Sequence, residues 1–192
     1  MLPLLLASSS IYRRDLLARL RLPFNCSSPD IDESHRPGES ARELVERLSL
    51  EKARALADSH PGHLIIGSDQ VAVLNGHIIG KPHTFDKARQ QLMDASGASV
   101  TFLTGLTLLN ARTGDHQTDC IPFTVHMRTL GTEQIERYLL AETPYDCTGS
   151  FKAEGLGVSL FQRTEGDDAT SLVGLPLIRL IDMLLVEGVT IP

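Results

Sequence analysis

The sequence predicts an α/β fold built on a mixed sheet. Short apolar runs such as Leu64–Gly67 have the length and composition of buried strands. Segments with helical periodicity alternate with these runs, which is typical of α/β proteins. Two further runs, Val71–Leu74 and His77–Ile79, flank Asn75-Gly76, the strongest short hairpin signal in the chain. The chain has 192 residues, 42% of them hydrophobic, so we expect one domain spanning residues 1–192 with a sizeable core.

The N-terminal region predicts a strand followed by a helix. Leu2–Ala7 is apolar throughout, and the serine triplet 8–10 follows it. In the next run Leu16, Leu17 and Leu20 share one helical face. Serine hydroxyls before such a run satisfy the free N–H groups of the first turn, so the triplet contains the expected N-cap.

The next three elements are a strand, a loop and a long helix. Phe24–Ser28 is a second candidate strand, ended by Pro29, and the polar stretch Asp30–Glu39 is expected to be a loop. Ser40–Ser59 is predicted to be helical, because its leucines recur on or near one face. Its opening residues 40–43 match a capping box.

The middle of the chain predicts one helix and a pair of long strands. The polar residues 68–70 are interpreted as the end of the strand that begins at Leu64. Thr84–Ser96 is expected to be helical. Val100–Asn110 and Gln117–Met127 are expected to be long strands joined through Thr113-Gly114.

The C-terminal part is less regular. Thr132–Ala141 is predicted to be helical, whereas Phe151–Gln162 is partly apolar and interrupted by glycines. Thr164–Thr170 is interpreted as a loop. Pro176–Glu187 is the final predicted helix, with its proline near the first turn.

The charge balance argues against a general nucleic-acid binder. The chain carries 18 Lys and Arg against 24 Asp and Glu, a net charge of −6, whereas nucleic-acid binders normally show a basic face. An anionic substrate must therefore be held by a few placed cations or by a metal.

The cysteines and the hydropathy indicate a cytoplasmic protein with no membrane segment. Cys26, Cys120 and Cys147 are odd in number and lack CxxC spacing, so we expect reduced thiols. No apolar run approaches the length of a membrane span, and even Leu175–Val186 is interrupted by two charged residues.

The junction after the first strand is a candidate phosphate site. Backbone N–H groups and the positive end of a helix dipole face outward there, and Ser8, Ser10 and Arg13 could supplement them. From this segment alone, plain N-capping beside a solvated arginine is the preferred interpretation.

Four charged residues are candidates for chemistry. Asp69 follows an apolar strand, and ligands in open α/β sheets gather beyond the carboxyl ends of strands. An Asx turn explains this residue equally well. Glu33 and Asp69 are candidate metal-binding or base carboxylates, and Lys52 and Lys81 are candidate phosphate cations. Taken alone, Lys52 would lie on the surface of its helix.

Eight segments give the sequence a family resemblance, because their order and spacing match those of the Maf family of nucleoside triphosphate pyrophosphatases. They are LLLASSSIYRRDLL (4–17), PDIDES (29–34), LEKA (50–53), IIGSDQV (65–71), GKP (80–82), TGLTLL (104–109), GSFKAEGLG (149–157) and LVGLPL (172–177).

The resemblance implies a fold, a reaction and a cofactor. Family members are elongated α/β molecules with two lobes around a deep nucleotide-binding cleft, and resemble inosine triphosphate pyrophosphatases in fold. They hydrolyse nucleoside triphosphates to monophosphate and diphosphate with a divalent cation, Mg²⁺ or Mn²⁺, and are linked to nucleotide-pool housecleaning. A small-molecule nucleotide is therefore the expected partner.

The resemblance also assigns roles to the candidate residues. Asp69 would be the proton acceptor, acting with three further catalytic residues: Glu33, Lys52 and Lys81. The substrate would be bound by Ser8, Ser10 and Arg13. Glu33 and Asp69 would be the metal ligands.

Three positions match the subgroup that acts on 7-methyl-GTP, namely Tyr12, Gln70 and Glu154. Members acting on dTTP and UTP typically have Ser-Asp-Thr where this chain has Ser68-Asp69-Gln70. N7-methylation makes guanine cationic, which favours stacking on an aromatic ring and contact with a carboxylate. Without the resemblance, Tyr12 would be a surface aromatic and Glu154 a solvated loop acid.

Two alternatives stay open at this point. One is a pyrophosphatase for dTTP and UTP or with broader specificity, and the other is a non-catalytic nucleotide-binding regulator of cell division. The oligomeric state is also open, with a homodimer as one option.

Overall fold

The computed structural model describes residues 2–191 and confirms the α/β fold with a mixed sheet. Met1 and Pro192 lie outside the described residues. The strands are β1 (Leu4–Ala7), β2 (Phe24–Ser27), β3 (Leu64–Leu74), β4 (His77–Ile79), β5 (Ser99–Asn110), β6 (His116–Met127) and β7 (Phe161–Glu165). The α-helices are α1 (Ile11–Ala18), α2 (Ala41–Arg54), α3 (Phe85–Ala95), α4 (Thr132–Glu142), α5 (Ala169–Val173) and α6 (Leu177–Val186). Two short 3₁₀-helices are η1 (Thr148–Ser150) and η2 (Leu156–Leu160).

The chain divides into two compact units, as expected for a two-lobed molecule. Within the described residues, unit 1 comprises residues 2–70, 104–121 and 168–191, and unit 2 comprises residues 71–103 and 122–167. The strand order is β2-β1-β3-β5-β6-β7, with β4 paired to β3. Strands β3, β5 and β6 contribute residues to both units.

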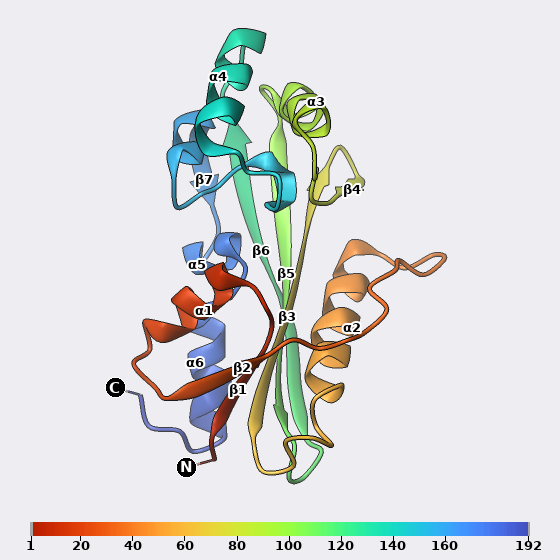
Figure 1. Ribbon diagram of the computed structural model, residues 1–192, viewed down its shortest axis with the longest axis vertical. Helices are drawn as coiled ribbons and strands as arrows, with labels where there is room; N and C mark the ends of the chain where they lie inside the picture. Colours follow the sequence, from red (N-terminus) through yellow and green to blue (C-terminus); the bar gives the residue numbers. More distant parts are fainter. Residues whose placement is uncertain (1, 192) are drawn as a thin grey trace. The chain divides into compact units, whose positions relative to one another are not determined.

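The sheet of unit 1 buries both faces. β1 pairs in parallel with β2 and with β3. Alternate residues of β1 point to opposite sides: Leu4 and Leu6 pack in the cluster that includes α1 and α6, whereas Leu5 and Ala7 pack toward α2. Figure 1 shows α2 on one side of these strands, with α1 and α6 on the other. Apolar residues therefore run continuously along the strand, as in other parallel sheets.

Two glycines let α2 approach the sheet closely. A Cβ on Gly67 of β3 would lie 2.0 Å from the carbonyl oxygen of Ser49, and a Cβ on Gly105 of β5 would lie 2.1 Å from that of Val45. The Ser49 and Thr107 hydroxyls are hydrogen-bonded at 2.9 Å across the same contact. Because glycine has no side chain, these two positions allow α2, which carries Lys52, to lie against the sheet.

Unit 2 contains the predicted hairpin and an aromatic core. β3 and β4 pair antiparallel around Asn75 and Gly76, whose φ angles of 50° and 80° match the turn that Asn-Gly favours. Phe151 packs edge-on against Phe102 and Phe161, with ring centroids 5.3 and 4.8 Å apart. These rings join β5, β7 and the segment around η1 in one core.

Three expected boundaries are wrong. The polar residues 68–70 do not end a strand, because β3 continues unbroken to Leu74. The helix expected over Ser40–Ser59 ends at Arg54 and passes into turns, although its capping box at Ser40 is present. Part of the loop expected over Thr164–Thr170 belongs to β7, whose residues Thr164 and Glu165 pair with β6.

No helix within residues 2–191 is long and apolar enough to cross a membrane. The three cysteines carry thiols, and among them Cys120 is buried and Cys26 is exposed.

Candidate active site

A buried lysine joins two carboxylates in unit 1. The Lys52 side chain is only 8% exposed, and its Nζ donates to Asp69 Oδ1 at 2.6 Å. The same Nζ forms an ion pair with Glu33 Oε1 at 3.0 Å. A buried charge is costly unless it is paired, so Lys52 and Asp69 stabilise each other in place. The surface position that its helix pattern alone would favour for Lys52 is therefore not observed.

Asp69 itself lies within β3, not at a strand tip as expected. Its side chain is 11% exposed, and Lys52 reaches it from α2 on the sheet face that Gly67 leaves open. Asp69 thus sits on a rigid strand rather than on an Asx turn.

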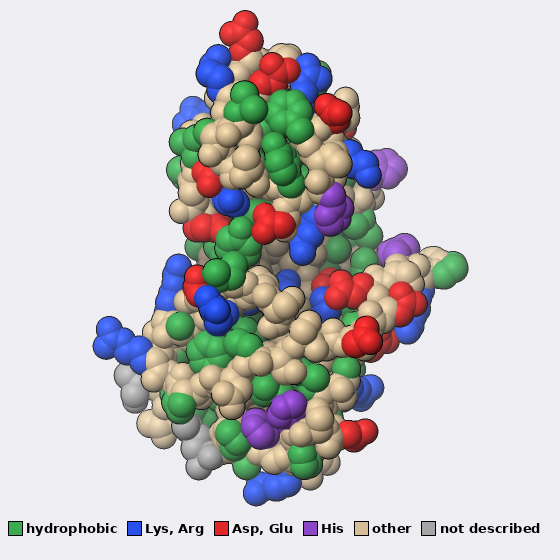
Figure 2. Space-filling view, in the orientation of Figure 1, with side chains coloured by type: hydrophobic (Ala, Val, Ile, Leu, Met, Phe, Trp, Pro, Cys, Tyr) green, Lys and Arg blue, Asp and Glu red, His purple; other side chains and the backbone are tan. Residues whose placement is uncertain are grey.

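An ion-pair network fastens the loop that carries Glu33 to α2. Arg47 binds Glu39 through two nitrogens, at 2.5 and 2.8 Å, and also donates to the Ser34 carbonyl at 3.1 Å. Arg36 pairs with Glu51 at 3.0 Å. Figure 2 shows acidic and basic side chains mixed over the loop before α2.

The start of α1 has the expected serine caps. Ser10 is the N-cap, and its hydroxyl accepts from the Arg13 N–H at 3.4 Å. The Ser8 hydroxyl accepts from the Ser10 N–H at 3.1 Å. Tyr12 lies half-buried in the first turn. Both serines therefore shape the junction between β1 and α1.

Arg13 is held by the backbone that follows α5. Its Nε donates to the Gly174 carbonyl at 2.7 Å, and the buried Ser68 hydroxyl donates to the same oxygen at 2.9 Å. Gly174 has a φ of 115°, and a Cβ there would lie 3.4 Å from Arg13 Nε. A side chain at this position would meet backbone strain.

Burial lowers the pKa of the Arg13 guanidinium, while the negative charges of Asp69 and Glu33 oppose this effect. Arg13 therefore interacts electrostatically with the same two carboxylates that Lys52 binds. Unit 1 brings together the guanidinium, the ammonium and the two acids.

The Gln70 amide is also tied to α5. Its Nε2 donates to the Ser171 carbonyl at 2.7 Å, to the Leu172 carbonyl at 3.2 Å and to the Thr104 hydroxyl at 2.9 Å. These acceptors fix the orientation of the amide, with its oxygen directed away from the two carbonyls.

Lys81 lies in unit 2, on an exposed loop whose flanks are fixed. The Gln91 side chain donates to the Gly80 carbonyl at 3.2 Å and accepts a short hydrogen bond from the Ser150 hydroxyl. On the other flank, the His83 N–H donates to the Tyr145 carbonyl at 3.0 Å. The loop thus presents Lys81 from a supported backbone.

Glu154 is exposed in unit 2, between η1 and η2. Neighbouring residues fix its segment to α4. The Tyr138 hydroxyl accepts from the Lys152 N–H at 3.0 Å, and Glu142 Oε2 accepts from the Leu156 N–H at 2.7 Å. Burial raises the pKa of Tyr138, so its phenol stays protonated and neutral.

The carboxylate pair in unit 1 is suited to a hydrated divalent cation. Among residues 2–191, no three His, Cys, Asp or Glu side chains are grouped so that they could hold a metal ion. Glu33 and Asp69, however, already share one cationic group at 3.0 and 2.6 Å. Mg²⁺ is commonly bound by one or two carboxylates together with water and substrate phosphates. The donor set therefore fits a cation that is completed by a polyphosphate.

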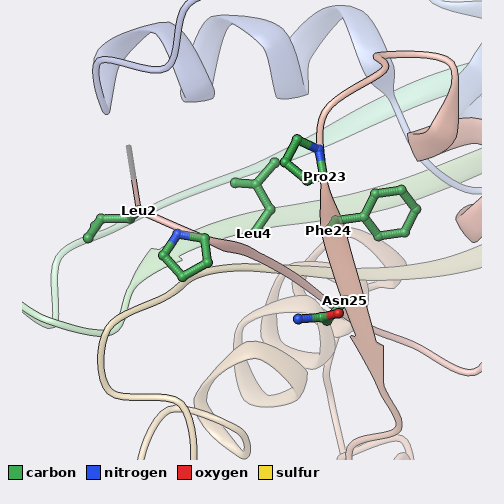
Figure 3. A pocket seen from close by; sticks show the side chains of 6 residues that line it. Leu2, Leu4, Pro23, Phe24 and Asn25 are labelled. Carbon is green, nitrogen blue, oxygen red and sulfur yellow. The ribbon is translucent and has the colours of Figure 1, made fainter.

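A separate cavity in unit 1 lacks the features of a phosphate site. It has a volume of about 320 Å³ and is lined by Leu2, Pro3, Leu4, Pro23, Phe24 and Asn25 (Figure 3). None of these residues is charged. The cavity lies at the start of β1, whereas Ser8 follows its end.

Sequence reasoning missed the residues that orient the others. The carbonyls of Ser171, Leu172 and Gly174 accept from Arg13, Ser68 and Gln70. Asp168 and Thr170 fix α5 itself. The one available signal was the LVGLPL segment, which ends the α5 turn.

Sequence comparisons with known proteins show one family, and a solved structure shares the fold. A family model described as Maf-like protein matches residues 3–186. The chain is 80% identical to a protein named 7-methyl-GTP pyrophosphatase from Pseudomonas fluorescens (strain Pf0-1), covering 100% of both chains. It is 71% identical to a protein of the same name from Pseudomonas aeruginosa, covering 98% of both. Among solved structures, the Staphylococcus aureus Ham1 protein is similar in fold, with a TM-score of 0.51, 13% identity, and coverage of 97% of this chain and 98% of that one.

Proposed function

The chain belongs to the Maf family, and from this premise we propose that it hydrolyses 7-methyl-GTP to 7-methyl-GMP and diphosphate. The main structural support is the buried Lys52 ammonium between Asp69 and Glu33. The negative charges of both acids also raise the pKa of Arg13. Such a cluster of cations and carboxylates is suited to a polyphosphate and a water molecule.

In this proposal Asp69 is the proton acceptor. Water attacks the α-phosphorus, the bond between that phosphorus and the bridging oxygen to the β-phosphorus breaks, and diphosphate leaves. Lys52 occupies Oδ1 of Asp69, so Oδ2 is the atom that would receive the proton from the attacking water. The contact with Lys52 and the position of Asp69 within β3 orient this oxygen.

The cations of the chain would stabilise the charge that develops on the leaving diphosphate. Arg13 is half-buried and oriented by Gly174, which suits it to two-point binding of phosphate oxygens. Ser8 and Ser10 shape the amino end of α1, whose N–H groups favour anions. Lys81 is proposed as a further phosphate-binding cation.

We propose that Glu33 and Asp69 bind a divalent metal ion, Mg²⁺ or Mn²⁺, together with the substrate phosphates. The bound ion would neutralise phosphate charge and polarise the phosphoryl oxygens. Lys52 would then share its two carboxylates with the incoming cation.

Tyr12, Gln70 and Glu154 are proposed to select the base. A cationic 7-methylguanine stacks well on the Tyr12 ring, and the Glu154 carboxylate can accept from the N1–H and 2-amino donors. The Gln70 amide is fixed by α5, so its oxygen offers one acceptor in a constant position.

The proposed setting is the cytoplasm, where the enzyme would remove a methylated nucleotide from the free pool. Thiol cysteines are typical of that reducing compartment. The expected arrangement is a single 1–192 domain, acting alone or as a homodimer.

Turnover of 7-methyl-GTP, GTP, dTTP and UTP, each with and without Mg²⁺, tests the function. Diphosphate release should be fastest with 7-methyl-GTP and should require the metal. Asp69→Asn should lower kcat by at least about 100-fold, the upper range for loss of a general base, with the melting temperature retained. Preference for dTTP or UTP, or nucleotide binding without turnover, would contradict the proposal. Full activity of Asp69→Asn would require another base.

A further inference from the structure

α5 and the glycine that follows it orient three side chains through their backbone. The Gly174 carbonyl accepts from Arg13 Nε and from the Ser68 hydroxyl, and the Ser171 and Leu172 carbonyls accept from Gln70 Nε2. Two of these side chains serve different tasks in the proposed function, since Arg13 binds phosphate and Gln70 contributes to base choice. Any shift of α5 would move both.

A helix of five residues cannot hold such a position by itself. The fixing contacts come from Asp168, which is 3% exposed and precedes the helix. Its Oδ1 accepts from the Thr170 N–H at 2.9 Å and from the Thr170 hydroxyl at 2.5 Å. Its Oδ2 accepts from the Ile178 N–H at 2.8 Å.

The same contacts also attach α5 to α6. The N-cap of α6 is Pro176, which offers no side-chain cap. The first amides of α6 are satisfied by α5 instead: the Leu177 N–H donates to the Thr170 hydroxyl at 2.8 Å, and the Ile178 N–H donates to Asp168. One buried carboxylate thereby caps two helices, and α6 is a ten-residue helix packed in the core of unit 1.

We propose that Asp168 is a positioning residue for phosphate binding and base selection. It fixes the α5 backbone to α6, and the α5 carbonyls then orient Arg13 and Gln70. This inference rests on the proposed function for the roles of those two side chains. Thr170 is the second member of the same clamp, because its hydroxyl donates to Asp168 and accepts from α6.

The test uses two substitutions that break the clamp and two controls. Asp168→Asn keeps the size of the side chain but replaces one of its two acceptor oxygens with an NH2 group, so the donors of Thr170 and Ile178 cannot both be satisfied. Thr170→Val removes the hydroxyl at constant shape, and Thr170→Ser restores it. Asn110→Ala removes the hydrogen bond from Asn110 to Glu187 at the opposite end of α6, which measures the effect of lost stability alone.

Two readouts separate positioning from plain destabilisation. The first is kcat/KM for 7-methyl-GTP and for GTP, because a smaller folded fraction lowers both values equally, whereas a displaced Gln70 changes their ratio. The second is hydrogen exchange of the Arg13 Nε–H, followed by NMR and assigned as the signal that Arg13→Lys lacks. This exchange reports the contact with Gly174 without any need for turnover.

Asp168→Asn and Thr170→Val should lower kcat/KM for 7-methyl-GTP by about 10- to 100-fold, the range expected for displaced catalytic groups. They should also reduce the ratio of kcat/KM for 7-methyl-GTP to kcat/KM for GTP, and they should speed up hydrogen exchange at Arg13 Nε. Thr170→Ser and Asn110→Ala should keep the wild-type ratio and exchange rate. Unchanged ratio and exchange in the two folded clamp variants would overturn the inference. An inactive wild-type protein would refute the proposed function, and the exchange rates would still decide the role of Asp168.

Discussion

Glu154 is the residue that should distinguish methylated from unmethylated guanine. Its carboxylate is exposed, and Tyr138, Lys152 and Glu142 fix the segment around it. Glu154→Gln keeps hydrogen-bonding atoms but removes the negative charge that opposes the cationic ring. A charge-assisted hydrogen bond contributes about 1.5–3 kcal/mol, so the preference for 7-methyl-GTP over GTP should fall by about tenfold or more. Parallel kcat/KM measurements on the two nucleotides check this.

The matched control is Glu165→Gln, which also removes an exposed carboxylate in unit 2 but lies in β7. It should leave the ratio unchanged. Equal losses on both nucleotides in Glu154→Gln would mean that the residue does not discriminate between the bases.

At the residue scale, the sequence indicated which residues belong to the site better than it indicated what those residues contact. The motifs pointed to Lys52 and Asp69, but helix periodicity placed Lys52 among solvated charges. Its burial depends on Gly67 and on the close approach of α2, a contact between segments that local patterns do not encode. The partner of Arg13 was equally hidden, because it is the main-chain oxygen of a residue 161 positions away.

Helix α2 and strand β3 form the element pair that brings Lys52 to Asp69. Gly67→Ala would place a methyl group against the Ser49 carbonyl, so α2 must move outward. Overpacking of this kind costs about 1–3 kcal/mol, and the displaced helix should also weaken the ion pair between Lys52 and Asp69. Urea unfolding should therefore show a lower free energy of unfolding, and assays of diphosphate release should show a lower rate.

Gly62→Ala is the suitable comparison, because a Cβ at Gly62 meets nothing within 4 Å and lies in the turn before β3. This variant should be as stable as the wild type or slightly more stable. If Gly67→Ala were as stable as Gly62→Ala, α2 could move outward without a loss in the free energy of unfolding.

At the element scale, the polar residues of β3 suggested a strand end that the structure does not have. Polar residues 68–70 within an apolar run are typical of a strand end, yet each has a buried partner: Gly174 for Ser68, Lys52 for Asp69 and α5 for Gln70. These partners satisfy the polar atoms, so the strand continues. Elements with local signals, such as the capping box of α2 and the Asn-Gly hairpin, were predicted correctly.

The whole molecule should lose stability in acid partly through one ion pair. Hydrogen bonds from Arg47 lower the pKa of Glu39 from its usual 4.5 to about 2. Between these values the unfolded chain takes up a proton that the folded chain does not, so stability falls as pH drops from about 4.5 toward 2. Glu39→Gln lacks this titration. Urea unfolding at several pH values should therefore show a shallower acid slope for the variant, and identical slopes would contradict the assignment.

The fold class was predictable because alternation of strands and helices is a property of the whole chain. The division into two units was not visible in composition or linkers, since strands β3, β5 and β6 contribute residues to both. No local break in the sequence marks the point where such a strand passes from one core to another.

The use of backbone carbonyls by Arg13, Ser68 and Gln70 has an evolutionary consequence. Genetic drift can exchange the side chains of Leu172 and Val173 for other apolar groups, because the oxygens that do the orienting belong to every amino acid alike. Gly174 has no such freedom, since its φ of 115° suits glycine alone. The amino-acid sequence of a short helix can thus change in related proteins while the hydrogen bonds made by its backbone are retained.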